Sequence, residues 1–260
     1  MALQKYKRDS ELTYALGATL VEELLETHPD AITRAFLRPT ERQGDQLKAI
    51  IKELKDRKIE IIESTKAFNI LGAKDNCLLA AEFKKSCLYA HDDDIITMCT
   101  PGVIKGIMLV NPSDSGNLGT IMRSAAAFGF NDITIVTPAV DPFDPKVIRA
   151  SMGAIFHLFI RQAPDYAWIN ERVGDYYLAF LLDKDAQPLE SLKSSSYHYT
   201  DHNPNPDFIL VFGNEATGLP ADFCARTGAT PVYIQQSEDV DSLNLGVAAS
   251  IAMHHFKDVE

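Results

Sequence analysis

The chain has 260 residues, of which 46% are hydrophobic and 23% are charged, so it can bury the core of one large domain or two modest ones. No stretch approaches the roughly 18 uninterrupted apolar residues of a membrane span, and no apolar run follows the basic N-terminus as in a secretory signal. The net charge of −11 excludes a globally basic nucleic-acid-binding protein, although residues 1–91 are nearly balanced and the excess acid lies in 92–260.

Residues 1–91 form a first segment that is predicted to alternate helix, strand, helix and strand. Apolar residues recur at helical spacing in two stretches, and short apolar runs indicate strands. The expected helices are Ala18–Thr27 and Gly44–Lys58, and the expected strands are Ile32–Leu37 and Ile59–Glu63, with a further apolar patch at Cys77–Ala81. The lysines of the second helix favour a solvated face over a nucleic-acid-contacting one.

Residues 92–102 are predicted to form a linker, because repelling acidic residues are followed there by turn residues. Residues 103–260 then alternate strands and helices. The expected strands are Ile107–Val110, Asp132–Thr137, Ile155–Ile160, Tyr177–Leu182, Phe208–Phe212 and Pro231–Ile234, and the expected helices are Leu118–Phe128, Lys146–Met152 and Leu243–Phe256. This alternation predicts an α/β domain with a mostly parallel sheet, helices on both faces, and ligands at the carboxyl ends of the strands.

Cysteine and histidine spacing gives no sign of a metal site. The four cysteines are Cys77, Cys87, Cys99 and Cys224. Because none forms a CxxC pair, we expect free thiols in a reducing, cytoplasmic compartment. His198 and His202 are four residues apart, but they lie in a Ser/Tyr/Asn/Pro-rich stretch, where helical ligand spacing has little meaning. A metal hydrolase is therefore disfavoured, and no metal is expected.

A glycine-containing turn follows the first strand of the second segment and opens a helix. It contains Gly116 and Gly119, which do not match the G-x-G-x-x-G of dinucleotide-binding folds, and it lacks the lysine of a P-loop. A dinucleotide-dependent oxidoreductase is therefore disfavoured. Arg123 lies about one turn further along the helix, where it can either pair with a surface carboxylate or bind an anion beside the turn.

Two further strands also run into polar loops. After Phe212 the chain continues as Gly213-Asn214-Glu215 and reaches Gly218, and two glycines five residues apart are typical of a loop that folds tightly around a ligand. Glu215 can cap the following helix or contact a substrate. After Ile234, an acidic loop leads to Ser242-Leu243-Asn244.

Ser242 suits the N-cap of the last helix. Asn244 would then lie just inside the helix, where asparagine is unfavourable, which suggests a role for its side chain.

Together, these stretches resemble the three motifs of the SpoU (TrmH-like) RNA 2′-O-ribose methyltransferases of the SPOUT superfamily. The family patterns are N-x-G-x-x-x-R, G-x-E-x-x-G-[LI] and S-L-N. They are matched by Asn117, Gly119 and Arg123, by Gly213, Glu215, Gly218 and Leu219, and by Ser242, Leu243 and Asn244. The stretch Val147–Ala154 also looks like the family, and residues 1–91 resemble its small α/β substrate-binding domain.

The resemblance implies a parallel sheet whose C-terminal part, within residues 103–260, forms a trefoil knot. It also implies a homodimer that binds S-adenosylmethionine among the knot loops. The residues expected to bind this cofactor are Phe212, Gly213, Asn214, Gly218, Ile234 and Leu243. Many relatives carry Ile-Pro-Met where this chain has Ile234-Gln235-Gln236, a difference near the expected cofactor site.

The family also implies roles in methylation of a ribose 2′-hydroxyl. Arg123 is the expected catalytic residue, Asn117 helps to hold the acceptor site, and Glu215 supports the arginine or the substrate. Ser242 and Asn244 orient the acceptor. Because guanidinium stays protonated in proteins, we expect it to clamp a phosphate and stabilise developing negative charge. The expected partner is structured RNA, with ribosomal RNA slightly favoured over transfer RNA; the alternative is a catalytically silent RNA-binding protein.

Overall fold

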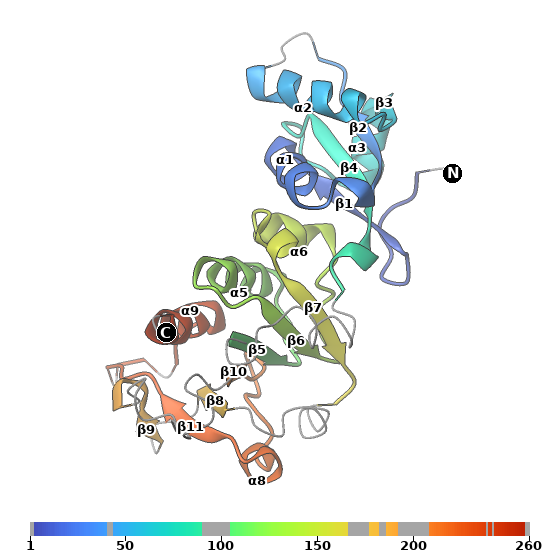
Figure 1. Ribbon diagram of the computed structural model, residues 1–260. Coiled ribbons are helices and arrows are strands. Elements are labelled where there is room, and N and C mark those ends of the chain that lie inside the picture. The colour runs from blue at the N-terminus through green and yellow to red at the C-terminus, as the bar shows by residue number, and fades with distance from the viewer. Residues whose placement is uncertain are drawn as a thin grey trace, which may run out of the picture. The chain divides into compact units, whose positions relative to one another are not determined.

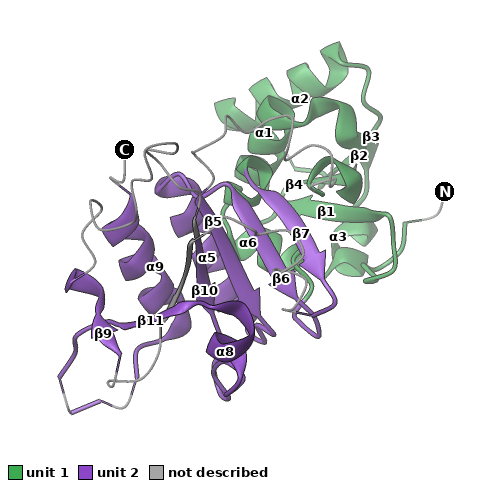
Figure 2. Ribbon diagram, turned by 60° about the horizontal axis from the view of Figure 1, so that its bottom comes forward, with its two compact units in different colours: residues 1–89, 141–157 green, residues 90–140, 158–260 purple. Residues whose placement is uncertain are grey.

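The computed structural model describes most of the chain (Figure 1). The described residues are 3–40, 44–89, 105–165, 177–181, 186–191, 208–237, 239–240 and 242–257. The chain divides into two compact units: unit 1 comprises residues 1–89 and 141–157, and unit 2 comprises residues 90–140 and 158–260 (Figure 2). The predicted linker at 92–102, Cys99, His198 and His202 lie outside the described residues.

Unit 1 contains a mixed four-stranded sheet in the order β1-β4-β2-β3. Strand β4 is antiparallel to β1 and β2, whereas β3 is parallel to β2. The elements are β1 (Leu12–Leu16), α1 (Ala18–Thr27), η1 (Pro29–Ala31), β2 (Ile32–Leu37), α2 (Asp45–Asp56), β3 (Ile61–Glu63), α3 (Thr65–Leu71), β4 (Leu79–Lys84), η2 (Lys85–Cys87), α6 (Pro145–Ala150) and η3 (Ala154–His157). Both predicted helices and both predicted strands of this region are confirmed, with shifts of one or two residues at some ends.

Strand β1 and helix α3 were not predicted from the sequence. Helix α3 has both of its terminal signals: the Ser64 side chain accepts a hydrogen bond from the backbone N–H of Ala67 at 3.2 Å, and Gly72 ends the helix with φ 65°. With seven residues, however, it is too short to display a helical repeat of apolar positions.

The segment 141–157 is bound to the rest of unit 1 by several polar contacts. The hydroxyl of Tyr6 donates to the carboxylate of Asp141. The hydroxyl of Thr13 donates to the carbonyl of Phe143 at 2.6 Å, and His28 Nε2 lies 2.9 Å from the carbonyl of Phe156. These contacts explain why this segment belongs to unit 1 although it follows strand β6 in the sequence.

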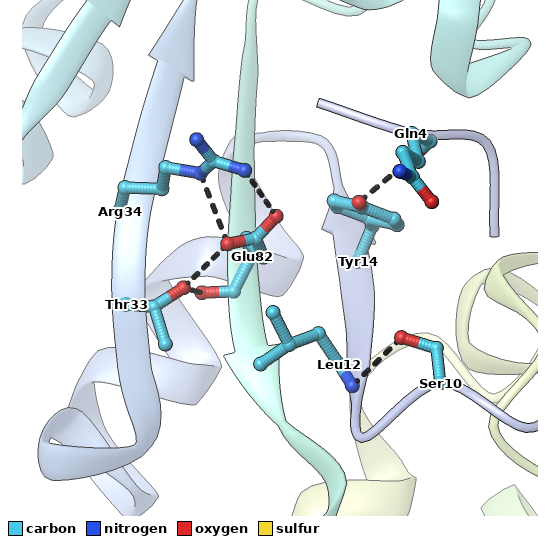
Figure 3. A network of polar contacts seen from close by, with 7 residues as sticks. All are labelled: Gln4, Ser10, Leu12, Tyr14, Thr33, Arg34 and Glu82. Carbon is cyan, nitrogen blue, oxygen red and sulfur yellow. Dashed lines mark hydrogen bonds and ion pairs between the residues drawn. The ribbon is translucent and has the colours of Figure 1, made fainter. Parts of the chain in front are cut away.

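A nearly buried ion pair joins two strands of the unit 1 sheet (Figure 3). Arg34 donates from Nε to Glu82 Oε1 at 2.9 Å and from Nη2 to Oε2 at 2.8 Å, and Thr33 donates to Oε1 at 2.8 Å. This fork geometry satisfies both carboxylate oxygens inside the sheet. Burial, together with the nearby Glu82 carboxylate, raises the pKa of the Tyr14 phenol to about 12.

Unit 2 contains a seven-stranded sheet in the order β7-β6-β5-β10-β8-β11-β9, with every neighbouring pair parallel. Its elements are β5 (Lys105–Val110), α5 (Ser115–Ala127), β6 (Asp132–Val136), β7 (Phe159–Ala163), β8 (Tyr177–Leu181), β9 (Gln187–Pro188), η4 (Leu189–Ser191), β10 (Phe208–Phe212), α8 (Phe223–Thr227), β11 (Thr230–Tyr233) and α9 (Leu245–Phe256). The prediction of an α/β protein with a parallel sheet is confirmed.

The predicted strand at Ile155–Ile160 is wrong in its first half. Residues 154–157 form the short helix η3, and the strand begins at Phe159. Ile155 and Phe156 are buried in unit 1, so their apolar character reflects a buried turn, which periodicity alone does not distinguish from a buried strand.

Within the described ranges, no helix is both long and apolar enough to cross a membrane. The same part of the chain contains no group of three or more His, Cys, Asp or Glu residues arranged to hold a metal ion. Cys77, Cys87 and Cys224 are free, partly buried thiols.

Candidate active site at the ends of the central strands

Strands β5 and β10 lie side by side at the centre of the unit 2 sheet, so the loops that follow them meet at the same edge. Asn111 follows β5 directly and has a left-handed backbone with φ 54°. Its carbonyl accepts a hydrogen bond from Asn214 Nδ2 at 2.8 Å, and its own Nδ2 donates to the carbonyl of Pro138 at 3.1 Å. These bonds connect the loops that follow β5, β6 and β10.

The loop after β10 is folded tightly, as the two glycines predict. Asn214 and Gly218 exchange backbone hydrogen bonds of 3.1 and 2.9 Å, and Asn214 Oδ1 accepts from the backbone N–H groups of Ala216 and Thr217. A Cβ atom on Gly213 would lie 2.4 Å from the carbonyl carbon of Gly218. Only glycine at position 213 therefore allows the loop to close in this way.

Glu215 joins this loop to the N-terminal end of α5. Its carboxylate accepts hydrogen bonds from the backbone N–H of Ser113 at 3.1 Å and of Asp114 at 3.2 Å. It also accepts from the Ser113 hydroxyl at 2.7 Å and from Asn117 Nδ2 at 3.2 Å. The helix that follows Pro220 instead has Asp222 at its N-cap position, so Glu215 does not cap that helix.

The pKa of Glu215 reflects these contacts. Partial burial opposes ionisation, but the hydrogen bonds from Ser113 and Asn117 outweigh it and leave the pKa of this carboxyl below its usual value. The carboxylate of Glu215 also lies at the N-terminal end of α5. Backbone N–H groups and the positive end of the helix dipole face a group in this position, and both favour a negative charge there. Glu215 is therefore a carboxylate at neutral pH.

Asn244 connects the last helix to the same network. Its Nδ2 donates to Asn117 Oδ1 at 2.9 Å, while its Oδ1 accepts from the backbone N–H groups of Gly246 at 2.9 Å and Val247 at 3.3 Å. Asn244 is thus the N-cap of α9, which corrects the expectation that Ser242 occupies that position. The apparent conflict of an asparagine inside the helix is resolved, because the helix begins at Leu245.

Helices α5 and α9 pack together beyond this point. Ser124 Oγ and Ser250 Oγ lie 2.6 Å apart, and a Cβ atom on Gly246 would lie 3.2 Å from Thr120 Cγ2. This close packing fixes the direction of α5, which carries Asn117 and Arg123. It also keeps the first turns of the two helices close enough for Asn117 and Asn244 to bond.

Arg123 is exposed on α5. It lies six residues after Asn117, which places it roughly 9 Å further along the helix axis. No side chain in the described part of the chain forms a hydrogen bond or ion pair with its guanidinium. The structure therefore joins Asn117 to both Glu215 and Asn244, and it shows no partner for Arg123 among the described residues.

The other expected residues occupy the same strand-end region. Phe212 is buried at the end of β10, Ile234 and Leu243 are half-buried beyond β11 and before α9, and Ser242 is exposed. Two residues of the network, Ser113 and Asp114, were not singled out from the sequence. Asp114 caps α5 by accepting from the backbone N–H of Asn117 at 2.7 Å, and an aspartate just before a helical stretch was the sequence signal for this cap.

Two family models match the chain. Residues 105–254 match the SpoU rRNA Methylase family. Residues 14–68 match the model described as RNA 2'-O ribose methyltransferase substrate binding. The first match covers the whole described network, and the second lies within unit 1.

Curated relatives match over little more than half of this chain. The chain is 31% identical over 147 residues to Ribosomal RNA small subunit methyltransferase G 2 of Syntrophobacter fumaroxidans, covering 56% of this chain and 26% of that protein. It is 28% identical over 155 residues to the 23S rRNA (guanosine(2553)-2'-O)-methyltransferase RlmP of Bacillus subtilis, covering 59% and 58%. The chain thus spans less than two thirds of the length of these relatives.

Solved structures share the fold over nearly the full chain. The AdoMet-bound rRNA methyltransferase from Sinorhizobium meliloti superposes with a TM-score of 0.75 at 23% identity, covering 94% of this chain and 86% of that one. The SpoU methyltransferase AviRb from Streptomyces viridochromogenes, in complex with AdoMet, gives a TM-score of 0.76 at 18% identity, covering 95% and 90%. These structures share the fold, and the family model matched over residues 105–254, more than half of the chain, shows that the chain belongs to the SpoU rRNA methylase family.

Proposed function

We propose that this protein methylates a ribose 2′-hydroxyl in structured RNA, using S-adenosylmethionine as methyl donor. The observation that carries this proposal is the network of Asn117, Glu215 and Asn244. These three side chains come from three separate motifs, and Asn117 is hydrogen-bonded to both of the others. Arg123 lies on the same helix as Asn117 and has no carboxylate partner in the described part of the chain.

The residues around the strand ends fit S-adenosylmethionine. Ile234 and Leu243 offer half-buried apolar surface for an adenine ring, and the loop from Gly213 to Gly218 offers backbone groups for polar atoms. Phe212, at the end of β10, anchors the start of this loop. Asn214 forms hydrogen bonds within the loop. Two structural neighbours are named as AdoMet-bound, which supports the same ligand here. When bound, the cofactor supplies an electrophilic methyl group.

The side chains of this protein have separate tasks in the proposed reaction. Arg123 clamps a phosphate next to the acceptor ribose and stabilises negative charge that develops on the attacking oxygen. Asn117, held by Glu215 and Asn244, fixes the first turn of α5 and the acceptor site. Ser242 offers an exposed hydroxyl to the acceptor. Because Arg123 stays protonated, the 2′-hydroxyl proton passes to a phosphate oxygen or to water.

The first test is methyl transfer from S-adenosylmethionine to unmodified total RNA, followed by nucleoside mass spectrometry. A new 2′-O-methyl nucleoside is expected with the wild-type protein and a loss of at least about 100-fold with Arg123→Ala, comparable to removal of an oxyanion-hole donor. Arg123→Lys retains the charge but not the fork, so full activity of this variant contradicts the clamp. Cofactor and RNA binding without methylation of any RNA would favour the silent RNA-binding protein.

Ribosomal RNA is the proposed substrate class. The Bacillus subtilis relative is named for 2'-O-methylation of 23S rRNA, which supports this choice over transfer RNA. Mapping the methylated nucleotide after separate incubation with ribosomal and transfer RNA decides between them. Methylation confined to transfer RNA would overturn the assignment.

We also propose a homodimer and a trefoil knot. Val247 and Ile251, one turn apart on α9, are 47% and 38% exposed, and Val240 is 52% exposed, so α9 presents apolar surface to a partner. Light scattering should give twice the chain mass for the wild type and a monomer for Ile251→Asp. The knot is supported by the position of β10 between β5 and β8. An experimental structure with an unthreaded C-terminal segment would overturn it.

A further inference from the structure

The arginines that the structure describes fall into two groups. Of the eight arginines in the described ranges, four form ion pairs with carboxylates: Arg34, Arg57, Arg161 and Arg226. The other four, within the same ranges, have no carboxylate partner: Arg8, Arg38, Arg123 and Arg149. Arg123 belongs to the proposed active site of unit 2, whereas Arg38 and Arg149 belong to unit 1.

Arg38 is held in a fixed orientation just after strand β2. Its Nε donates to the carbonyl of Cys77 at 3.1 Å and its Nη2 donates to the carbonyl of Lys74 at 3.5 Å. Its guanidinium carbon lies 4.7 Å from the centroid of the Phe68 ring. These partners are neutral, so they orient the group and leave its positive charge uncompensated.

Arg149 lies in the last turn of α6, on the segment 141–157 that folds with unit 1. Burial raises the pKa of the Cys77 thiol, while the positive charges of Arg38 and Arg149 act on it in the opposite direction. Arg38 bonds directly to the Cys77 carbonyl, and the charge of Arg149 acts on the thiol of the same residue, so both guanidinium groups belong to the Cys77 side of unit 1. Lys74 is exposed three residues before Cys77 and adds a third positive charge.

The turn after Arg149 has unusual backbone geometry. Met152 has φ 53° and an exposed side chain, and its backbone N–H donates to the carbonyl of Arg149 at 3.1 Å. Left-handed backbone at a residue other than glycine costs free energy and is found preferentially at ligand-binding sites. The side chain of Met152 is flexible and polarizable, which suits it to contact a ligand bound next to Arg149.

We propose that Arg38, Lys74 and Arg149 form a phosphate-binding surface by which unit 1 holds the substrate RNA. This inference rests on the proposed function for the identity of the ligand. It goes beyond the matched substrate-binding region, because residues 14–68 include Arg38 but neither Lys74 nor Arg149. The surface joins the loop after β2, the loop before β4 and the end of α6. Arg149 thus adds to the RNA-binding surface a residue that lies between β6 and β7 in the sequence.

Binding of an unmodified ribosomal RNA transcript, measured by fluorescence anisotropy over a range of salt concentrations, tests this surface. Arg149→Ala and Lys74→Ala should each weaken binding several-fold and lower the slope of log K against log salt by roughly 0.7–0.9. Arg57→Ala, which removes an exposed but paired arginine from the same unit, is the matched control and should leave both quantities unchanged. If Arg149→Ala and Lys74→Ala both keep the affinity and salt dependence of Arg57→Ala, the proposal is overturned.

Arg38→Met is a less direct test of the surface, since loss of the contact with Phe68 can destabilise unit 1. The surface therefore needs a second measurement. Lysine acetylation in the presence and absence of the transcript avoids substitution altogether. Lys74 should be protected by RNA, whereas Lys52 on the outer face of α2 should react equally in both samples. Protection of Lys52 without protection of Lys74 would place the RNA on α2 and overturn the surface.

The binding assays separate this inference from the proposed function. A wild-type protein that binds RNA through this surface but transfers no methyl group contradicts the function alone. A protein that methylates RNA with an unchanged KM in Arg149→Ala and Lys74→Ala contradicts the surface alone. If both proposals hold, the KM for RNA rises in these variants while kcat and S-adenosylmethionine affinity stay at wild-type values. Absence of any RNA binding by the wild type contradicts both.

Discussion

The carboxylates of Glu82 and Glu215 each accept hydrogen bonds from several donors, but in opposite surroundings. Glu82 is 3% exposed inside the unit 1 sheet and faces the charged guanidinium of Arg34. Glu215 is exposed at the strand ends of unit 2, and its partners are neutral hydroxyl, amide and backbone groups. The same functional group therefore stabilises a sheet in one unit and organises a set of loops in the other.

The surroundings determine what each carboxylate can do. Inside the sheet, the hydrogen bond that Arg34 donates to Glu82 is the main reason that the pKa of Arg34 is raised, and the two charges are paired with each other. At the strand ends, Glu215 positions Asn117 without neutralising a cation. A network of this second kind leaves cations such as Arg123 available for a ligand. The following variants test this difference, from the largest expected effect to the smallest.

Replacement of Arg34 should produce the largest loss of stability. Arg34→Met leaves the Glu82 carboxylate buried without its charged partner, which should lower the free energy of unfolding by about 3–5 kcal/mol. Urea denaturation followed by circular dichroism measures this loss. Methyl-transfer activity per folded molecule should stay near the wild-type level, because the network of unit 2 is untouched.

The double variant Arg34→Met/Glu82→Gln is the control for this effect. It removes both charges, so it should recover most of the stability lost in the single variant. A single variant that loses less than about 1 kcal/mol would show that Glu82 finds solvent or another partner. The pair would then resemble a surface ion pair, and the contrast with Glu215 would disappear.

The sequence predicted the strands and helices that carry long apolar patterns, and it predicted the three motifs. It did not predict that Arg34 and Glu82 pair, because they are far apart in the chain and meet only through the antiparallel pairing of β2 and β4. The contact between Asn117 and Asn244 was likewise not predicted from the sequence, since it depends on the packing of α5 against α9. Local patterns specify elements, whereas these pairs depend on how the elements are assembled.

Segment 141–157 illustrates the same limit. Its Asp-Pro helix start was readable from the sequence, because proline suits the first helical turn. Its membership of unit 1 was not readable, since it depends on contacts such as the bond from Thr13 to the Phe143 carbonyl. The capping role of Asn244 was also missed, because Ser242 satisfies the same preference when only local sequence is considered.

Replacement of Glu215 should reduce activity more than stability. Glu215→Gln keeps the shape but presents an amide to donors such as Asn117 Nδ2, so the first turn of α5 loses its fixed position. We expect kcat to fall about 10–100-fold, or roughly 1.4–2.7 kcal/mol in activation free energy, with a change in unfolding free energy of about 1 kcal/mol or less.

Glu190→Gln, at an exposed glutamate of the same unit, is the matched control and should behave as wild type. A Glu215→Gln variant with normal kcat would mean that the network is only structural. Its role would then be the same as that of Glu82.

Two substitutions at Asn244 separate its capping bond from its bond to Asn117. Asn244→Ala removes both and should cost about 0.5–2 kcal/mol of stability as well as activity. Asn244→Asp keeps an oxygen for the N–H groups of Gly246 and Val247 but replaces the donor that faces Asn117 Oδ1. This variant should unfold like the wild type and still lose activity. Equal activity of Asn244→Asp and the wild type would limit Asn244 to capping α9.

The smallest expected effect is the pH dependence of stability at Glu215. Its pKa in the folded protein is lowered, so its ionic contribution is present above the unfolded-state pKa of about 4.3 and is lost as pH falls through the folded-state value. Because the carboxylate is mostly solvated, the contribution should be only about a few tenths of a kcal/mol. Urea midpoints of wild type and Glu215→Gln should therefore converge slightly between neutral pH and about pH 3. Midpoints that instead diverge over this range would mean that the folded protein favours protonated Glu215, and that burial outweighs the hydrogen bonds from Ser113 and Asn117.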